Sequence, residues 1–201
     1  MKSIAVIGSG FSSIAAACYL AKAGLEVTVF EKNSSIGGRA RRFQKDGFTF
    51  DLGPSWYWMP DVFERFFADF GKKPSDYYIL DKLSPGYEVY FGENSSLKIS
   101  DNLENIYKMF EEEEKGSAKH LKTFLDSAKS NYDTAIKDLV YKPGVSPLEL
   151  VNTTTVARVS QFFSSVRKQV RKNIKSPKLI KILEFPVLFL GEKPSNTPAF
   201  Y

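Results

Sequence analysis

The chain has 201 residues, of which 43% are hydrophobic and 25% charged. These values are typical of globular proteins and exclude bulk disorder. No run of about 18 apolar residues suggests a transmembrane helix, and the start, MKSIAVIGSG, lacks the apolar stretch of a signal peptide. We therefore expect a cytoplasmic protein. One cysteine and one histidine exclude an internal disulfide and a zinc site built from that pair.

The N-terminal part of the sequence predicts a strand, a helix and a second strand. Residues 3–7 and 26–30 are apolar and β-rich, and residues 11–23 are dense in Ala and Leu. Gly24 stands where a helix commonly ends. A unit of this length predicts an α/β fold of the Rossmann type, with two parallel strands.

A glycine motif lies between the first strand and the helix. Gly8 suits the tight turn, and Gly10 lets the backbone approach a pyrophosphate at the helix N-terminus. Ser13 replaces the third glycine of the usual pattern and is small enough for close packing. Glu31 ends the second strand, where it accepts hydrogen bonds from an adenosine ribose and repels a 2′-phosphate. These features predict dinucleotide binding and make NADP a poor fit.

A second glycine pair follows soon after Glu31. Gly37 and Gly38 leave the backbone bare for another approach to a cofactor, and Arg39 adds a cation suited to phosphate or to a polar flavin edge. Gly53 then stands at a turn after an aromatic strand. An NAD dehydrogenase does not need this second cluster, so the pattern favours FAD.

The chain resembles the flavin amine-oxidase superfamily, and within it the bacterial-type phytoene or carotenoid desaturases, through GSGFSS, Glu31 and KNSSIGGRARRFQKDGFTFDLGPSWYWMP. The likeness extends over essentially the whole chain. It implies an FAD-dependent desaturase that introduces double bonds into a carotenoid such as phytoene, with hydride passing to the flavin. The cofactor-binding residues that it implies are Gly8, Gly10, Phe11, Ser12, Ser13, Glu31, Lys32, Gly38, Arg39, Gly53, Pro54 and Ser55.

The remaining sequence predicts a second, mixed region. We expect an FAD-binding domain over residues 1–76, which includes a strand at 47–51 and a helix from Asp61 to Phe70 with Asp61 as its cap. An α+β substrate domain over residues 77–201 follows, with a small antiparallel sheet and helices. Its expected elements are strands at 77–80, 87–91 and 97–99 and helices at 103–114 and 118–139. Relatives are far longer, so we expect this domain to be incomplete at its C-terminus.

Positive charge gathers in one stretch of this second region. Residues 150–183 hold eight Lys or Arg and no Asp or Glu. Apolar residues recur there at helical spacing from Val156 to Ile174, which predicts one amphipathic basic helix. Its apolar stripe either packs on the protein core or enters a membrane interface, where the cations near 158–175 would meet anionic lipid. No nucleic-acid-binding module accompanies it, so we expect no such partner.

Few side chains suggest direct chemistry. By resemblance, Glu149 aligns with an acidic position suspected of assisting proton transfer, but we prefer to interpret it as a helix-start carboxylate that the helix dipole favours. His120 is interpreted as a surface residue. Other readings of the same motif are a carotene isomerase, a retinol saturase, an amine or protoporphyrinogen oxidase, and a non-catalytic prenyl-group escort related to the GDP-dissociation inhibitors.

Overall fold

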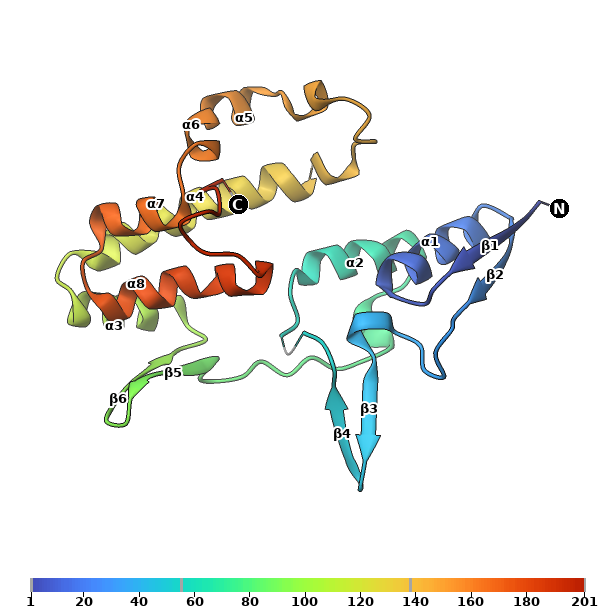
Figure 1. The fold of residues 1–201 in the computed structure, drawn as a ribbon, viewed down its shortest axis with the longest axis horizontal. Coiled ribbons are helices and arrows are strands. Elements are labelled where there is room, and N and C mark those ends of the chain that lie inside the picture. The colour runs from blue at the N-terminus through green and yellow to red at the C-terminus, as the bar shows by residue number, and fades with distance from the viewer. Residues whose placement is uncertain (1, 55, 138, 201) are drawn as a thin grey trace. The chain divides into compact units, whose positions relative to one another are not determined.

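The computed structural model describes residues 2–54, 56–137 and 139–200. The chain divides into two compact units, Met1–Leu80 and Asp81–Tyr201 (Figure 1). This division falls a few residues after the expected domain boundary at residue 76, which stays a prediction. None of the described helices combines the length and the apolar character needed to cross a membrane.

The first unit begins with the expected strand–helix–strand arrangement. Strand β1 (Ser3–Ile7) leads into helix α1 (Phe11–Lys22) and returns as strand β2 (Glu26–Phe30), which pairs with β1 in parallel. The two turns depend on glycine, since Gly8 and Gly24 have φ angles of +93° and +81° that other residues rarely adopt. The α/β class and the Rossmann-like start of the chain are thus confirmed.

An antiparallel hairpin follows the parallel pair. Strand β3 (Arg42–Lys45) pairs with β4 (Phe48–Asp51), and β4 was expected whereas β3 was not. The reason is that Phe43 is the one large apolar residue of β3, so the strand carries no alternating pattern. Phe43 packs on Phe50, with ring centroids 5.7 Å apart.

Helix α2 (Pro60–Asp69) starts differently from the prediction. The residue before its first turn is Met59, with φ +55°, and Pro60 is the first helical residue. The expected cap at Asp61 is therefore wrong: Asp61 lies inside the first turn. Proline favours this first position because its φ is already helical and it has no N–H that needs a partner.

Aromatic side chains from α2 also explain a missing strand. Residues 77–80 are irregular in the structure, preceded by the short turn η2 (Pro74–Asp76). Phe67 of α2 stacks on Tyr77 at 5.0 Å between ring centroids, and Tyr78 hydrogen-bonds the hydroxyl of Tyr57. These contacts hold the segment on α2, so the predicted three-stranded meander is a two-stranded hairpin.

The second unit combines that hairpin with a layer of helices (Figure 1). Strands β5 (Tyr87–Gly92) and β6 (Ser95–Ile99) pair in antiparallel fashion. The helical elements after them are α3 (Leu103–Glu113), α4 (Ser117–Lys137), η3 (Leu139–Tyr141), η4 (Pro147–Leu150), α5 (Thr153–Ala157), α6 (Val159–Phe162), α7 (Val166–Asn173), α8 (Pro177–Glu184) and η5 (Phe185–Leu190). The expected helices near 103–114 and 118–139 are confirmed.

The core of this unit lies between the hairpin and helices α3, α4 and α8. Phe110 and Leu179 are 1% and 0% exposed, and Ile99, Leu121, Ile174 and Ile182 complete the cluster. The Glu114 carboxylate, from the acidic run that ends α3, accepts the backbone N–H groups of Lys175 and Ser176 at 2.9 and 2.7 Å. One acidic residue thus fixes the start of α8.

The predicted single basic helix is wrong, because the chain breaks into α5, α6 and α7. The Ser165 side chain caps α7 by accepting the N–H of Lys168. The C-terminal segment packs against the chain where the helix is broken, and the N–H of Val166 donates to the carbonyl of Thr197 at 2.9 Å. As a result Val170 is 2% exposed in the core, whereas Phe163, before the break, is 87% exposed.

Candidate nucleotide site

The first glycine motif forms a tight corner at the carboxyl ends of β1 and β2. The Gly8 N–H donates to the Phe30 carbonyl at 2.7 Å, which ties the corner to the second strand. Gly10 then stands just before α1, where no side chain caps the helix and no acidic residue occupies its first turn. The first N–H groups of α1 and its positive dipole end are therefore available to an anion such as a phosphate.

The second glycine segment lies directly against the first. The Gly37 N–H donates to the Ser9 carbonyl at 3.0 Å. A Cβ placed on Gly38 would stand 3.1 Å from the Cα of Gly10, whereas a Cβ placed on Gly10 would meet no atom within 4 Å. Two segments that were singled out separately in the sequence thus share one surface, and that surface is open above Gly10.

Gly53 is required by close packing of backbone on backbone. A Cβ there would overlap the carbonyl oxygen of Arg39 and approach the Cα of Ala40 to 3.1 Å. The turn after β4 therefore packs against the short helix η1 (Gly38–Ala40). This contact attaches the third glycine position to the second segment, and it accounts for Gly53 without any ligand.

The carboxylate of Glu31 is held by four donors. One oxygen accepts the N–H and the hydroxyl of Ser9 at 2.9 and 2.6 Å, and the other accepts the backbone and side-chain N–H groups of Asn33 at 2.9 and 2.7 Å. The hydroxyl of Ser9 is the first cause that lowers the pKa of Glu31 to about 2. Glu31 is therefore ionised at neutral pH, and its charge lies beside the first glycine corner.

Ser9 and Asn33 were not among the residues chosen from the sequence. Ser9 is 3% exposed, and it is the one buried residue among those described in Met1–Leu80. Its place between Gly8 and Gly10 and the proximity of Asn33 to Glu31 were the available signals, but polar residues in turns are too common to stand out. Their role follows from the hydrogen bonds alone.

The other expected cofactor residues differ in their contacts and exposure. Ser13 of α1 directs its hydroxyl toward the Ile7 carbonyl at 3.5 Å, and Phe11 packs edge-on against Phe63. Arg39 makes no hydrogen bond or ion pair with any residue that the structure describes. Ser12, Lys32 and Pro54 are exposed. Ser55 lies outside the described residues, and ligand binding by all of these stays a prediction.

Glu149 belongs to the second unit and is engaged by its own loop. Its carboxylate accepts the backbone N–H groups of Gly144, Val145 and Ser146 at 2.9 to 3.1 Å. These hydrogen bonds, with that from Gly144 the strongest cause, lower the pKa of Glu149. A carboxylate with a lowered pKa is a weaker base, so this geometry favours the capping role over proton transfer.

Known proteins similar to this chain include a Rossmann-like domain family and carotenoid desaturases. A family model described as an NAD(P)-binding Rossmann-like domain matches residues 6–71. A carotenoid 3,4-desaturase of Haloarcula japonica is 40% identical over 98% of this chain and 41% of its own length. A 4,4′-diapophytoene desaturase of Staphylococcus haemolyticus is 34% identical over 98% of this chain and 40% of its own. The chain resembles carotenoid desaturases.

The relatives are much longer than this chain, which spans about two fifths of their length. Among solved structures, a triple mutant of putrescine oxidase matches with a TM-score of 0.51 and 18% identity, over 99% of this chain and 40% of that one. At this identity the match concerns the fold alone. It agrees with the expected mixed α/β fold.

Proposed function

We propose that the protein is an FAD-dependent desaturase that introduces double bonds into a carotenoid. The observation that carries the proposal is the meeting of the two glycine segments, in which Gly38 packs on Gly10 while the space above Gly10 stays open. The similarity to two carotenoid desaturases over almost the whole chain supports it. Because the chain spans about two fifths of the relatives' length, the proposed activity is that of a protein of their length.

The residues present fit the ADP half of a dinucleotide. Gly10 offers bare backbone, the N-terminus of α1 offers N–H groups to a pyrophosphate, and ionised Glu31 lies at the end of β2 where a ribose binds. FAD and NAD share this half, so the matched NAD(P)-binding model does not separate them. The second glycine segment, with the exposed guanidinium of Arg39 beside it, favours the longer contact that FAD makes.

Ribose binding requires one rearrangement in the chain. A carboxylate has about four acceptor positions, and Glu31 already accepts four hydrogen bonds. A ribose hydroxyl must therefore replace a donor. The side-chain amide of Asn33 is the one that can leave, because Asn33 is exposed whereas Ser9 is buried.

The chemistry of the reaction comes from the flavin, since no side chain accepts a hydride. The chain's own residues bind and orient. The N-terminus of α1 and Arg39 would hold the negative charge of the pyrophosphate, and Glu31 would bind the ribose and exclude a 2′-phosphate. The carboxylate of Glu149 accepts backbone N–H groups of its own loop and so stabilises that loop in the second unit.

The strands of the first unit support the view that it functions within a longer protein. Both faces of a parallel sheet are normally covered. Here Ile7 of β1 and Phe30 of β2 are 77% and 54% exposed. We propose that further sequence covers these strands and completes the flavin site.

The test of this function is the product. The protein at the relatives' length is purified and incubated with phytoene, and the absorption spectrum of the extracted carotenoid is followed. Desaturation shifts that spectrum to longer wavelengths because each new double bond extends the conjugation. A protein that binds FAD and leaves the spectrum unchanged would refute the desaturase assignment, and a colourless protein that takes up no FAD would favour the escort alternative.

We further propose that the protein approaches its apolar substrate at an anionic lipid surface, on the inner face of the cell membrane. The segment from Val140 to Phe163 supports this, because its exposed apolar side chains are those of Val140, Tyr141, Val145, Leu148, Val151, Val156, Val159, Phe162 and Phe163. Exposed lysines of α7, Lys168 and Lys172, follow it. Apolar side chains beside cations suit an interface with anionic lipid.

Sedimentation with vesicles tests the lipid contact. We expect binding to anionic vesicles that salt weakens, and a several-fold loss in Phe163→Asp. Phe48→Asp is the matched control, since Phe48 is 68% exposed on β4 and lies outside the segment. Equal binding to neutral and anionic vesicles, or an equal loss in both variants, would contradict the proposal.

A further inference from the structure

The residue between the two glycines of the first corner carries a side chain that the turn itself does not need. Gly8 provides the positive φ, and Gly10 provides the open backbone, so the approach to a pyrophosphate requires only the main chain of Ser9. Ser9 is nevertheless 3% exposed. A buried hydroxyl needs a hydrogen-bond partner, because its burial without one is costly. The partner of the Ser9 hydroxyl therefore indicates what this side chain does.

That partner is the carboxylate of Glu31. The Ser9 hydroxyl donates to Oε2 of Glu31 at 2.6 Å, which is the length of a charge-assisted O–H···O⁻ hydrogen bond. The N–H of Ser9 donates to the same oxygen at 2.9 Å. Asn33 donates its backbone and side-chain N–H groups to the other oxygen, Oε1. Each oxygen of the carboxylate is thus held by a different residue.

The two oxygens of Glu31 differ in what can reach them. Oε2 is bonded to Ser9, which is buried, whereas Oε1 is bonded to Asn33, which is exposed. A ligand from solution can therefore displace the Asn33 side chain and reach Oε1, but it cannot displace the hydroxyl of Ser9. Because a carboxylate is a rigid plane, the bond that holds Oε2 also sets the direction in which Oε1 points.

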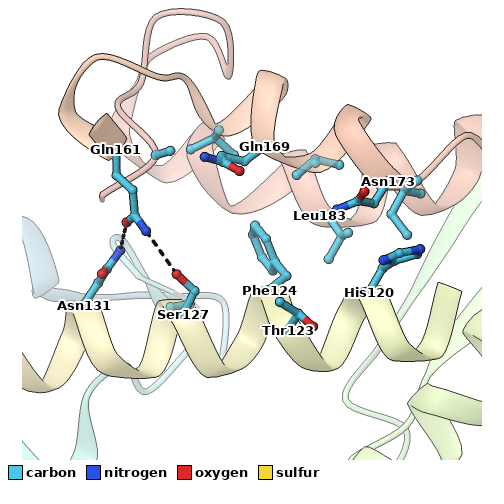
Figure 2. A pocket seen from close by; sticks show the side chains of 14 residues that line it. His120, Thr123, Phe124, Ser127, Asn131, Gln161, Gln169, Asn173 and Leu183 are labelled. Atoms are coloured by element: carbon cyan, nitrogen blue, oxygen red, sulfur yellow. Dashed lines mark hydrogen bonds between the residues drawn. The ribbon is translucent and has the colours of Figure 1, made fainter. Parts of the chain in front are cut away.

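A buried polar side chain in the second unit shows what a purely structural role looks like. Asn131 is 4% exposed and donates to Gln161 and to the Phe200 carbonyl at 2.9 Å each, while Arg158 donates to its side-chain oxygen. Figure 2 shows the bond to Gln161 on helix α4, the helix on which His120 is half-buried rather than at the surface as expected. Both donors of the Asn131 amide and its oxygen are thus bonded within the protein. The serine of the first unit differs, because the carboxylate that it holds keeps an oxygen on the exposed side.

We propose that Ser9 is a positioning residue that acts through Glu31: its hydroxyl fixes the carboxylate so that Oε1 accepts the ribose 2′-hydroxyl of an adenine nucleotide. The inference rests on the proposed function in one respect, namely that an adenosine diphosphate group binds at this corner. It adds that ribose recognition depends on a side chain that does not itself contact the ligand. The bond from Asn33 to Oε1 is the one that the ribose replaces, and the bond from Ser9 to Oε2 is the one that stays.

The same hydrogen bond sets the pH range in which the ribose is recognised. The Ser9 hydroxyl is the largest cause that lowers the pKa of Glu31 from 4.5 to about 2; hydrogen bonds from Asn33 and from the Ser9 N–H add to it, and desolvation opposes it. No charged side chain in the described part of the chain is among these causes. Without the hydroxyl the pKa rises toward 4.5. The carboxyl is then protonated at a higher pH, and a neutral carboxyl is a weaker acceptor than a carboxylate.

The test compares ADP with 2′-deoxy-ADP, because the two probes differ only in the ribose 2′-hydroxyl. Both are titrated by calorimetry against the protein at the relatives' length. We expect the wild type to bind ADP about 2- to 12-fold more tightly than 2′-deoxy-ADP, which is the effect of one hydrogen bond. In Ser9→Ala we expect this preference to fall at least about 2-fold at neutral pH, while the Kd of 2′-deoxy-ADP changes little. General damage to the corner would weaken both nucleotides equally, so the ratio separates positioning from loss of structure.

The pH profile of the same ratio gives a second readout. Between about pH 7 and pH 4.5 the wild-type preference should stay constant, because Glu31 remains ionised. In Ser9→Ala the preference should decline over this range as the carboxyl takes up a proton. The phosphate groups titrate alike in the two probes, so their effect cancels in the ratio.

Two further variants show whether Ser9 acts through Glu31. Ser34→Ala is the matched control, since Ser34 is an exposed serine of the same loop and is not one of the four donors to Glu31; we expect it to keep the wild-type preference and pH profile. In a Glu31→Gln background, Ser9→Ala should change the preference no further, because the residue through which it acts has been replaced. Ser9 is not among the residues with positive φ, so alanine adopts its backbone conformation, and circular dichroism checks that each variant is folded.

Four results would overturn the inference: no preference for ADP in the wild type, an unchanged preference in Ser9→Ala, equal weakening of both nucleotides in that variant, or a further effect of Ser9→Ala in the Glu31→Gln background. The proposed function fails differently, through absence of FAD uptake or of desaturation. A protein with the expected ADP preference and Ser9 dependence that forms no new double bond would refute the desaturase assignment and support the role of Ser9. A working desaturase in which Ser9→Ala keeps the preference would do the reverse.

Discussion

The glycine corner gives the sharpest prediction, because one substitution should separate cofactor binding from folding. Gly10 has φ −74° and ψ 172°, which alanine adopts without strain. A Cβ at Gly10 would meet no atom within 4 Å. We therefore expect Gly10→Ala to change the free energy of unfolding by no more than about 0.5 kcal/mol, as for an unconstrained surface position.

Binding of FAD should respond much more strongly. The added methyl group occupies the open space where the backbone must approach the pyrophosphate. An extra methyl in a closely packed site costs about 1–3 kcal/mol, which corresponds to about 5- to 150-fold in Kd. The assay is an FAD titration of both proteins, with thermal unfolding measured in parallel.

Gly86→Ala is the control for this experiment. Gly86 lies in the second unit, and a Cβ there would be 3.5 Å from the nearest atom, the carbonyl oxygen of Ile99, which is an ordinary contact. We expect this variant to bind FAD as the wild type does. If Gly10→Ala also binds FAD with unchanged affinity, the pyrophosphate does not pass above Gly10 and the argument from the open space is refuted.

Three further predictions concern stability and the carboxylates. Phe110→Ala should lower the free energy of unfolding by about 3–5 kcal/mol, since Phe110 is 1% exposed; a loss below about 1 kcal/mol in urea unfolding would contradict the core assignment. Because the pKa of Glu31 is lowered from 4.5 to about 2, its contribution to stability is present above pH 4.5 and is lost as the pH falls toward 2. Glu31→Gln should remove that part of the pH dependence. If the curves of unfolding free energy against pH run parallel for the wild type and the variant, this reasoning is contradicted. Glu149→Gln should speed hydrogen exchange at the amides of residues 144–146 and leave turnover largely intact, whereas full protection with abolished turnover would indicate catalysis.

Local sequence signals predicted the first unit well at positions where a residue type has a specific conformational role, such as glycine at a positive φ angle. Gly8 and Gly24 marked the turns, because both need positive φ, and β1, α1 and β2 followed from short apolar runs. β3 was missed because Phe43 is its one large apolar residue, so the strand has no alternating pattern. Asp61 was misplaced because Pro60 is a stronger start signal than an acidic cap.

Tertiary contacts decided the remaining elements. The helical spacing from Val156 to Ile174 carries no information about the C-terminal segment. The N–H of Val166 donates to the carbonyl of Thr197 in that segment, and the helix is broken at this point. The polar cluster around Glu31 likewise needed the structure, since Ser9 and Asn33 reach the carboxylate from both sides. Distant contacts of this kind leave no periodic pattern in a sequence.

The central claim, that the two glycine segments together hold FAD, is tested most directly by NMR of the labelled protein during an FAD titration. The account predicts that the backbone amide signals of Gly10 and Gly38 shift together and saturate at the same FAD concentration. If FAD binds and both of these signals stay in place, or if no signal moves at all, the cofactor is not held at this corner and the claim is contradicted.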